Sequence, residues 1–171
     1  MTAARSRPRR VVYRSRPHGD DVAALRRLVT ATRVFHPEER KIALELLTER
    51  LRVGRRSGYS FVFAELKGRL AGYCAWGKVP LTRESYDLYW IAVAPAAQGQ
   101  GLGQALMKRV ELAVAGRGGG GLYIETSSRR VYDRTRRFYG DAGYREVARL
   151  RDFYAPRDHK IVFCKVIRPR R

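Results

Sequence analysis

The first fifty residues show the hydrophobic periodicity of amphipathic helices. Between residues 21 and 33, apolar residues recur three and four positions apart, as in a helix that buries one face. Asp20 or Asp21 can cap the start of this helix. The apolar positions are Val22, Leu25, Leu28 and Val29.

A second helix is predicted from Pro37 to about Gly54. Proline suits the first turn of a helix, and Glu38 and Glu39 in that turn complement the helix dipole. We expect this helix to turn three apolar side chains inward. They are Ile42, Leu46 and Leu47.

Beyond this helix the pattern changes to short runs rich in β-branched and aromatic residues. Residues 59–66 and 70–78 flank Lys67, Gly68 and Arg69, which predicts an antiparallel hairpin. Residues 86–93 form a third run of this kind. Together with a short strand at residues 10–15, they would be the first four strands of a sheet.

The second half of the chain alternates helices and strands. Helices are predicted at residues 101–115 and 133–141, and strands at 122–126, 144–154 and 160–167. The resulting order, β-α-α-β-β-β-α-β-α-β-β, indicates an α/β fold with a mixed sheet. We expect a single domain over residues 10–168, preceded by a basic flexible tail at residues 1–9.

Composition narrows the class of protein. A chain of 171 residues with 44% hydrophobic residues suits one globular domain, and it has no apolar run long enough to span a membrane. Cys74 and Cys164 are too few for a disulfide framework, so a reducing, cytoplasmic compartment is the default expectation. His18, His36 and His159 lack metal-ligand spacing, so we expect no metal.

The formal net charge of +20 allows two interpretations. A nucleic acid or another polyanion would be attracted to such a surface. Alternatively, the charge reflects an arginine-rich composition on solvated faces. The basic residues form no single stripe and extend from Arg5 to Arg171, so the second interpretation is favoured and a nucleic-acid partner is not.

The segment from Gln98 to Gly103 joins a predicted strand directly to a predicted helix. Its glycines stand at alternate positions, so the backbone can approach a ligand, and its N–H groups can converge on an anion at the helix N-terminus. No acidic residue lies between Tyr89 and Val110 to repel a phosphate. These features predict a diphosphate-binding loop.

Two well-known glycine loops do not fit the segment. A P-loop requires Gly-Lys-Ser/Thr, which is absent. A dinucleotide fingerprint requires a third glycine where Gln104 or Leu106 stands. Residues 116–121 match that fingerprint's spacing, but they follow a helix and precede a strand, which is the reverse of the required context.

The pattern Gln-x-x-Gly-x-Gly after a strand ending in Val-x-Pro resembles the acetyl-CoA signature of the GNAT superfamily of N-acyltransferases. The resemblance extends over residues 59–166. Glu125-Thr126-Ser127-Ser128 is similar to the family's fifth strand, and Phe138-Tyr139 followed by Gly143-Tyr144 to its Phe-Tyr-x-x-x-Gly-Phe segment. Asp152-Phe153-Tyr154, with Asp158 and Lys160, is similar to its closing strands.

The resemblance implies a GNAT fold in which the fourth and fifth strands splay apart around the pantetheine arm of acetyl-CoA. The backbone of residues 91–93 would hold the pantetheine, the Val93 N–H would face the oxyanion, and the amides of residues 99–104 would hold the diphosphate. Part of the positive charge would serve capture of this anionic cofactor. The predicted cofactor-binding residues are Ile91, Ala92, Val93, Gln98, Gly99, Gln100, Gly101, Leu102, Gly103 and Gln104.

The resemblance also suggests catalytic residues. Tyr139 matches a family tyrosine that often lies near the cofactor sulfur, which makes it a candidate general acid; the alternative is a packed aromatic. Asp87, eleven residues before Gln98, is the first candidate base, or else a plain strand-edge acid, and Glu125 is the second candidate. Strand alternation predicts that Asp87, Tyr89 and Ile91 share one face.

At one position the chain departs from the family pattern. Many members have a cofactor-contacting asparagine seven residues before the tyrosine, and here that residue is Tyr132. We therefore expect Tyr132 to stack or pack instead of making that contact.

The expected function is transfer of an acetyl group from acetyl-CoA to a primary amine of a small molecule, amino acid or peptide, by direct attack in a ternary complex (an acyltransferase of the EC 2.3.1 type). The alternatives are an RNA- or ribosome-associated acyltransferase and a non-catalytic acyl-CoA-binding module. We expect a monomer or homodimer. The sequence does not identify the acceptor. Its site is shaped by the first two helices and the loop near residues 155–159, which are the parts of the sequence that reveal least.

Overall fold

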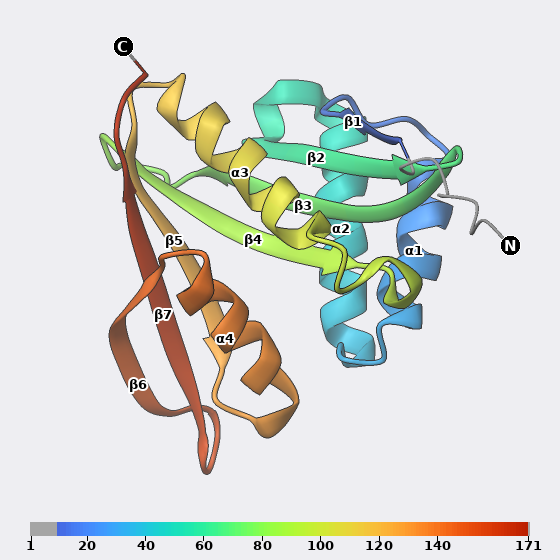
Figure 1. Cartoon of the computed structure of the whole chain (residues 1–171). Coiled ribbons are helices and arrows are strands. Elements are labelled where there is room, and N and C mark those ends of the chain that lie inside the picture. The colour runs from blue at the N-terminus through green and yellow to red at the C-terminus, as the bar shows by residue number, and fades with distance from the viewer. Residues whose placement is uncertain (1–9, 171) are drawn as a thin grey trace, which may run out of the picture.

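The predicted order of helices and strands is confirmed (Figure 1). The structure is a computed structural model that describes residues 10–170, so the predicted tail at residues 1–9 lies outside the described residues. The elements are β1 (Val11–Arg14), α1 (Asp21–Ala31), α2 (Pro37–Val53), β2 (Tyr59–Leu66), β3 (Arg69–Lys78), β4 (Ser85–Val93), α3 (Leu102–Ala115), β5 (Gly120–Ser127), α4 (Asp133–Asp141), β6 (Arg145–Ala155) and β7 (Asp158–Ile167). Three short 3-10 helices join them: η1 (Gly54–Ser57), η2 (Pro95–Ala97) and η3 (Arg130–Tyr132).

The strands form one mixed sheet in the order β1-β2-β3-β4-β5-β7-β6. Every neighbouring pair is antiparallel except β4 and β5, which are parallel. Helices α1 and α2 cover one face of the sheet, and α3 and α4 lie on the other (Figure 1). Each face has its own apolar core, one containing Leu25, Leu47 and Phe63 and the other containing Leu106 and Val110. Among residues 10–170, no helix is long and apolar enough to cross a membrane.

The β2–β3 hairpin turns more tightly than predicted, because β3 begins at Arg69. Lys67 and Gly68 are therefore the two turn residues, and both have positive φ angles, 52° and 71°. Two consecutive left-handed residues give the turn a twist that matches the flanking strands.

One side-chain orientation in α2 differs from the prediction. Ile42 is 48% exposed and Leu46 is half-buried, whereas Ala43 and Leu47 are fully buried. The buried row of α2 consists of residues one turn apart, 43 and 47, because the small side chain of Ala43 lets the helix pack closely on the sheet. The inward position of Leu47 is confirmed, and that of Ile42 is wrong.

The predicted splay of the central strands is also confirmed. Strands β4 and β5 pair only from Ser85 to Leu88, opposite Gly121 to Ile124. Beyond these residues each strand continues without the other as its neighbour, which leaves a gap in the middle of the sheet (Figure 1).

A β-bulge in β4 overturns the predicted alternation of its side chains. Trp76 pairs with Leu88 and Ala75 with Trp90, so Tyr89 is an extra residue opposite β3. Before the bulge, Leu88 packs in the core beneath α3, and after the bulge Ile91 does so. Tyr89 and Trp90 pack instead toward α1 and α2. Ile91 therefore lies on the face opposite Tyr89, because the extra residue shifts the two-residue period by one.

The first residue of β5 fixes the start of the parallel pairing. Gly120 has φ 129°, and a Cβ atom there would lie 2.0 Å from the Glu84 carbonyl oxygen. We expect Gly120→Ala to lower the free energy of unfolding by about 3 kcal/mol or more, because the clash is with backbone. Gly140→Ala in α4, where a Cβ meets nothing within 4 Å, is the control and should change stability by no more than about 1 kcal/mol. Equal stability of the two variants in denaturant unfolding would contradict this prediction.

Candidate active site

The gap in the sheet exposes backbone polar groups of β4. The Ala94 N–H donates to the Ala71 carbonyl of β3 at 2.8 Å. Because antiparallel pairs alternate, Gly72 and Val93 form a non-hydrogen-bonded pair, and the N–H and C=O groups of Ile91 and Val93 point away from β3 into the gap. The Gln98 side-chain amide donates to the Val93 carbonyl at 3.0 Å and so ties the glycine loop to the strand.

The glycine loop holds a row of backbone amides without backbone partners. Gly99 and Gly101 are left-handed, with φ 72° and 77°, and a Cβ at either would meet nothing within 4 Å. Among the described residues, the N–H groups of residues 99–104 donate to no backbone carbonyl, and the first helical bond of α3 runs from the Ala105 N–H to the Gly101 carbonyl. These donors lie at a helix N-terminus, where the helix dipole favours an anion.

The third glycine of the loop serves packing. A Cβ at Gly103 would lie 3.2 Å from the Phe138 ring. The N-terminal turn of α3 therefore packs closely on α4 and brings the next residue of α4, Tyr139, beneath β4. This contact joins the two halves of the sheet on the side of α3 and α4.

Tyr139 is buried under the diverging part of β4. It is 5% exposed, and its ring lies among Phe138, Tyr144 and Phe163, with centroid distances of 5.6, 6.4 and 5.7 Å. Burial raises the pKa of its phenol well above the usual value, and the nearby Cys74 thiol adds to this shift. Cys74 is the register partner of Ile91. The pKa direction keeps the Tyr139 phenol protonated at neutral pH.

The two candidate bases face the side of the sheet opposite Tyr139. Asp87 pairs in register with Tyr123, two residues before Glu125, so both carboxylates lie on one face of neighbouring strands. Partial burial raises the pKa of Asp87, the Glu125 charge raises it further, and Lys160 opposes the shift. Glu125 is ion-paired with Lys160 at 2.6 Å, whereas no ion pair of Asp87 occurs among the described residues.

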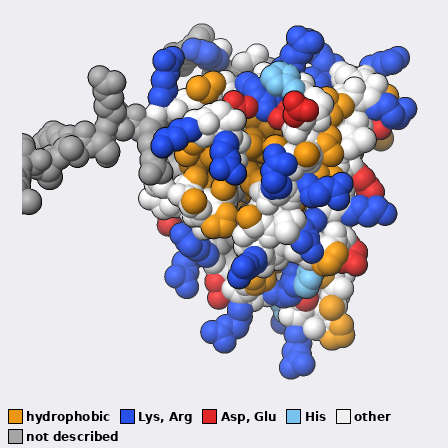
Figure 2. Space-filling model, turned by 90° about the vertical axis from the view of Figure 1, so that its right-hand side faces the viewer, with side chains coloured by type: hydrophobic (Ala, Val, Ile, Leu, Met, Phe, Trp, Pro, Cys, Tyr) orange, Lys and Arg blue, Asp and Glu red, His pale blue; other side chains and the backbone are white. Residues whose placement is uncertain are grey.

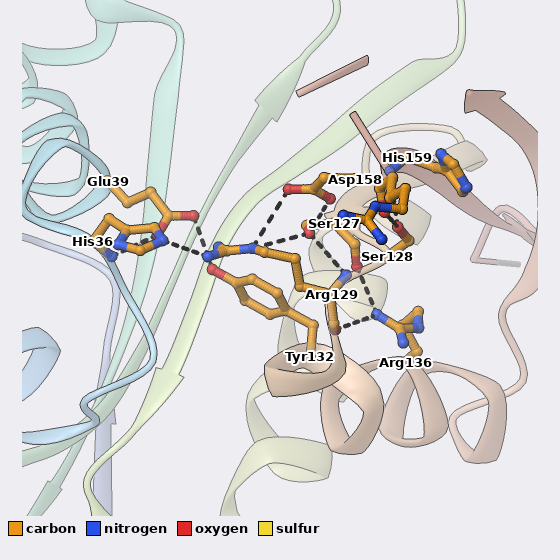
Figure 3. A network of polar contacts seen from close by, with 10 residues as sticks. His36, Glu39, Ser127, Ser128, Arg129, Tyr132, Arg136, Asp158 and His159 are labelled. Atoms are coloured by element: carbon orange, nitrogen blue, oxygen red, sulfur yellow. Dashed lines mark hydrogen bonds and ion pairs between the residues drawn. The ribbon is translucent and has the colours of Figure 1, made fainter. Parts of the chain in front are cut away.

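A polar network that the sequence did not predict connects the start of α2 with the end of β5 (Figure 3). The Tyr132 hydroxyl donates to Glu39 Oε1 at 2.8 Å, although the two residues are 93 positions apart. Arg129 contacts His36 and also reaches Asp158, with 3.5 Å between its Nε and Oδ2. The one signal in the sequence was Tyr132 itself, which stands where the family pattern has an asparagine.

Cys74 and His159, which the sequence analysis also considered, have structural surroundings that account for them. Cys74 is fully buried, which confirms it as a core residue, and burial raises its thiol pKa. The Asp152 N–H donates to His159 Nδ1 at 2.9 Å. Within residues 10–170 no group of three or more His, Cys, Asp or Glu residues could hold a metal ion.

A splayed mixed sheet with a glycine loop at the end of its fourth strand is the arrangement that the resemblance to the GNAT superfamily predicted. A family model described as an acetyltransferase (GNAT) domain matches residues 57–146. This range is more than half of the chain, which therefore belongs to the GNAT family of acetyltransferases.

Solved structures agree with this assignment. A protein from Desulfovibrio desulfuricans, described as belonging to the GNAT acetyltransferase family, is 44% identical over 92% of this chain and 99% of its own, with a TM-score of 0.90. An aminoglycoside 6'-N-acetyltransferase solved with coenzyme A shares the fold at 19% identity, over 94% of this chain and 98% of its own, with a TM-score of 0.71.

The curated relatives are longer proteins. A mycothiol acetyltransferase of Streptomyces bingchenggensis is 32% identical over 65% of this chain, but over only 36% of its own length. The chain spans about a third of the length of the curated relatives it matches. This similarity agrees with the acetyltransferase family.

Proposed function

We propose that the protein transfers an acetyl group from acetyl-CoA to a primary amine of a small molecule, amino acid or peptide, by direct attack in a ternary complex. The observation that carries the proposal is the row of free amides from Gly99 to Gln104, beside the unpaired edge of β4. The loop amides are suited to bind a diphosphate, and the edge of β4 is suited to extend a hydrogen-bond ladder to an amide-containing arm. Coenzyme A has both parts, and a neighbour in fold was solved with it bound.

The surface is suited to this donor. The side on which β4 ends has hydrophobic side chains at its centre, with Lys and Arg side chains around them (Figure 2). The methyl and methylene groups of the pantetheine arm match the apolar centre, and the anionic phosphates match the basic side chains around it. The other basic side chains are dispersed over this face, which does not favour an alternative in which RNA recruits the enzyme. A cytoplasmic location stays a prediction.

The proposed chemistry assigns one role to each side of the gap. From the side of α1 and α2, Asp87 accepts a proton from the attacking amine, directly or through water. The nitrogen then bonds to the acetyl carbonyl carbon, and the Val93 N–H donates to the resulting oxyanion. When the carbon–sulfur bond breaks, Tyr139 on the side of α4 donates its proton to the leaving thiolate. The products are the N-acetyl amine and coenzyme A; Asp87 then releases its proton to solvent, and Tyr139 regains one from solvent.

Binding and turnover test the donor assignment. Acetyl-CoA should raise the melting temperature, because a ligand that binds the folded state stabilises it.

Gly101→Ala should weaken coenzyme A binding about tenfold, because a left-handed alanine costs about 1–2 kcal/mol and displaces the amides. Gly118→Ala, at a left-handed glycine beyond the far end of α3, is the matched control with unchanged affinity. Titration calorimetry measures the affinity of each variant for coenzyme A. Acetyl transfer by wild type is followed as thiol release, with spermidine, tyramine, kanamycin and an alanine-initiated peptide as acceptors. Absence of both coenzyme A binding and thiol release would contradict the proposal.

The role of Tyr139 is tested by removing its hydroxyl alone. Tyr139→Phe should lower kcat by about 100-fold or more, since a general acid contributes roughly 10²–10⁴. The ring stays in place, so the dissociation constant of coenzyme A should change less than about twofold. A variant with normal kcat would assign Tyr139 to packing only.

The role of Asp87 is tested by the pH dependence of kcat/KM. Because the pKa of Asp87 is raised, its carboxylate becomes protonated at a higher pH than an ordinary aspartate does. Wild-type activity should therefore fall as the pH drops through the pKa of Asp87. Asp87→Asn should be slower by about 100-fold at neutral pH and should lose this acid limb. Glu125→Gln is the comparison and should have a smaller effect, because Lys160 already holds that carboxylate. An unchanged acid limb in Asp87→Asn would exclude Asp87 as the base.

A further inference from the structure

We infer that four residues, His36 and Glu39 of the α2 N-terminus with Arg129 and Tyr132 of the segment after β5, close the open end of the β4–β5 gap and position the acceptor. We call this set the α2–η3 bridge. The inference rests on the proposed function and deepens it, because the bridge concerns the acceptor and not acetyl-CoA.

The stronger contact of the bridge is the hydrogen bond from Tyr132 to Glu39. Its donor is buried, and its length is 2.8 Å. Burial and the Glu39 carboxylate both raise the pKa of Tyr132, so the hydroxyl stays a donor. The other oxygen of Glu39 accepts from the His36 N–H at 2.6 Å and caps α2. Glu39 therefore joins the start of α2 to η3 with both carboxylate oxygens engaged.

Arg129 forms the second contact and anchors it to β5. Its guanidinium contacts His36 Nε2 and lies over the Tyr132 ring, 5.2 Å from the centroid. The same group is 3.3 Å from Ser127 Oγ at the end of β5 and 3.5 Å from Asp158 Oδ2 on β7. Figure 3 shows these side chains meeting from the two halves of the fold.

On the other side the bridge is anchored to the diverging part of β4. Phe35, directly before His36, lies 5.2 Å from Trp90 between ring centroids. The contacts therefore run from Trp90 through α2 and η3 to Ser127, across the gap that begins after Leu88 and Ile124. The gap is thus joined at one end by strand pairing and at the other by the bridge.

The bridge also borders the face on which the acceptor is proposed to bind. Ser127, which Arg129 contacts, is two residues after Glu125 on β5, so their side chains lie on the same face of the sheet. Asp87, in register with Tyr123 on β5, lies on this face as well. A wall fixed by the Glu39–Tyr132 bond would set the distance between α2 and the candidate base, and hence the position of an amine. Glu39 and Tyr132 are therefore positioning residues.

The test separates acceptor effects from donor effects. Glu39→Ala, Tyr132→Phe and the double variant are compared with wild type, with coenzyme A as the probe of the donor site. The acceptor probe is whichever of spermidine, tyramine, kanamycin and the alanine-initiated peptide wild type acetylates fastest. Glu49→Ala is the matched control on α2, since among residues 10–170 Glu49 forms an ion pair with Arg52 alone, on the exposed side of the helix.

Each single variant should raise the KM of the acceptor about 3- to 10-fold, the loss expected for one hydrogen bond. The dissociation constant of coenzyme A and kcat should stay within about twofold. The double variant should match the single variants, because either substitution removes the same bond. Glu49→Ala should behave as wild type.

Other outcomes would overturn the inference. A weaker affinity for coenzyme A in Tyr132→Phe, with an unchanged acceptor KM, would place Tyr132 at the cofactor. Additive effects in the double variant would show that the two residues act separately. Wild-type protein that binds no coenzyme A overturns the proposed function and this inference with it, whereas normal binding with an unchanged acceptor KM in all variants overturns this inference alone.

Discussion

The short parallel pairing of β4 and β5 is the constraint on which the rest of the structure depends. Only four residues of each strand are in register, from Ser85 to Leu88 and from Gly121 to Ile124. A sheet that opens there leaves backbone donors and acceptors unpaired, and buried groups of this kind require partners. Gln98 supplies one, to the Val93 carbonyl. The remaining groups of β4 that point into the gap are suited to an amide-containing ligand.

The opening would separate the two halves of the fold if nothing else joined them. Among the contacts that join the two halves, two lie beside the opening, on opposite faces of the sheet. On the face of α3, Gly103 allows the Phe138 ring to pack closely. On the face of α2, the polar α2–η3 bridge makes the connection. The apolar contact lies at the glycine loop, and the polar one reaches Ser127, two residues after Glu125. The proposed function divides donor and acceptor chemistry between the two faces in the same way.

Local signals carried most of the fold prediction. The order of elements followed from periodicity, and the loop at residues 98–103 from glycine spacing between a strand and a helix. The bulge at Tyr89 could not be found in this way, because one extra residue reverses alternation without changing composition. The orientation of α2 was missed at Ile42, since helical spacing left two adjacent rows available and packing selected the one containing Ala43.

The bridge was beyond local reasoning for a different reason. Glu39 and Tyr132 are 93 residues apart, and each has a sufficient local explanation as a helix-capping acid and a packed aromatic. The departure of Tyr132 from the family asparagine was visible, but its meaning required the partner. A hydroxyl that donates to Glu39 is already engaged, so the substitution exchanges a cofactor contact for a contact between α2 and η3. Under the proposed function, such an exchange would leave the donor site to backbone amides, which any side-chain sequence can supply, and would use side chains to shape the acceptor site. The acceptor should therefore be encoded in residues that differ among relatives with the same glycine loop.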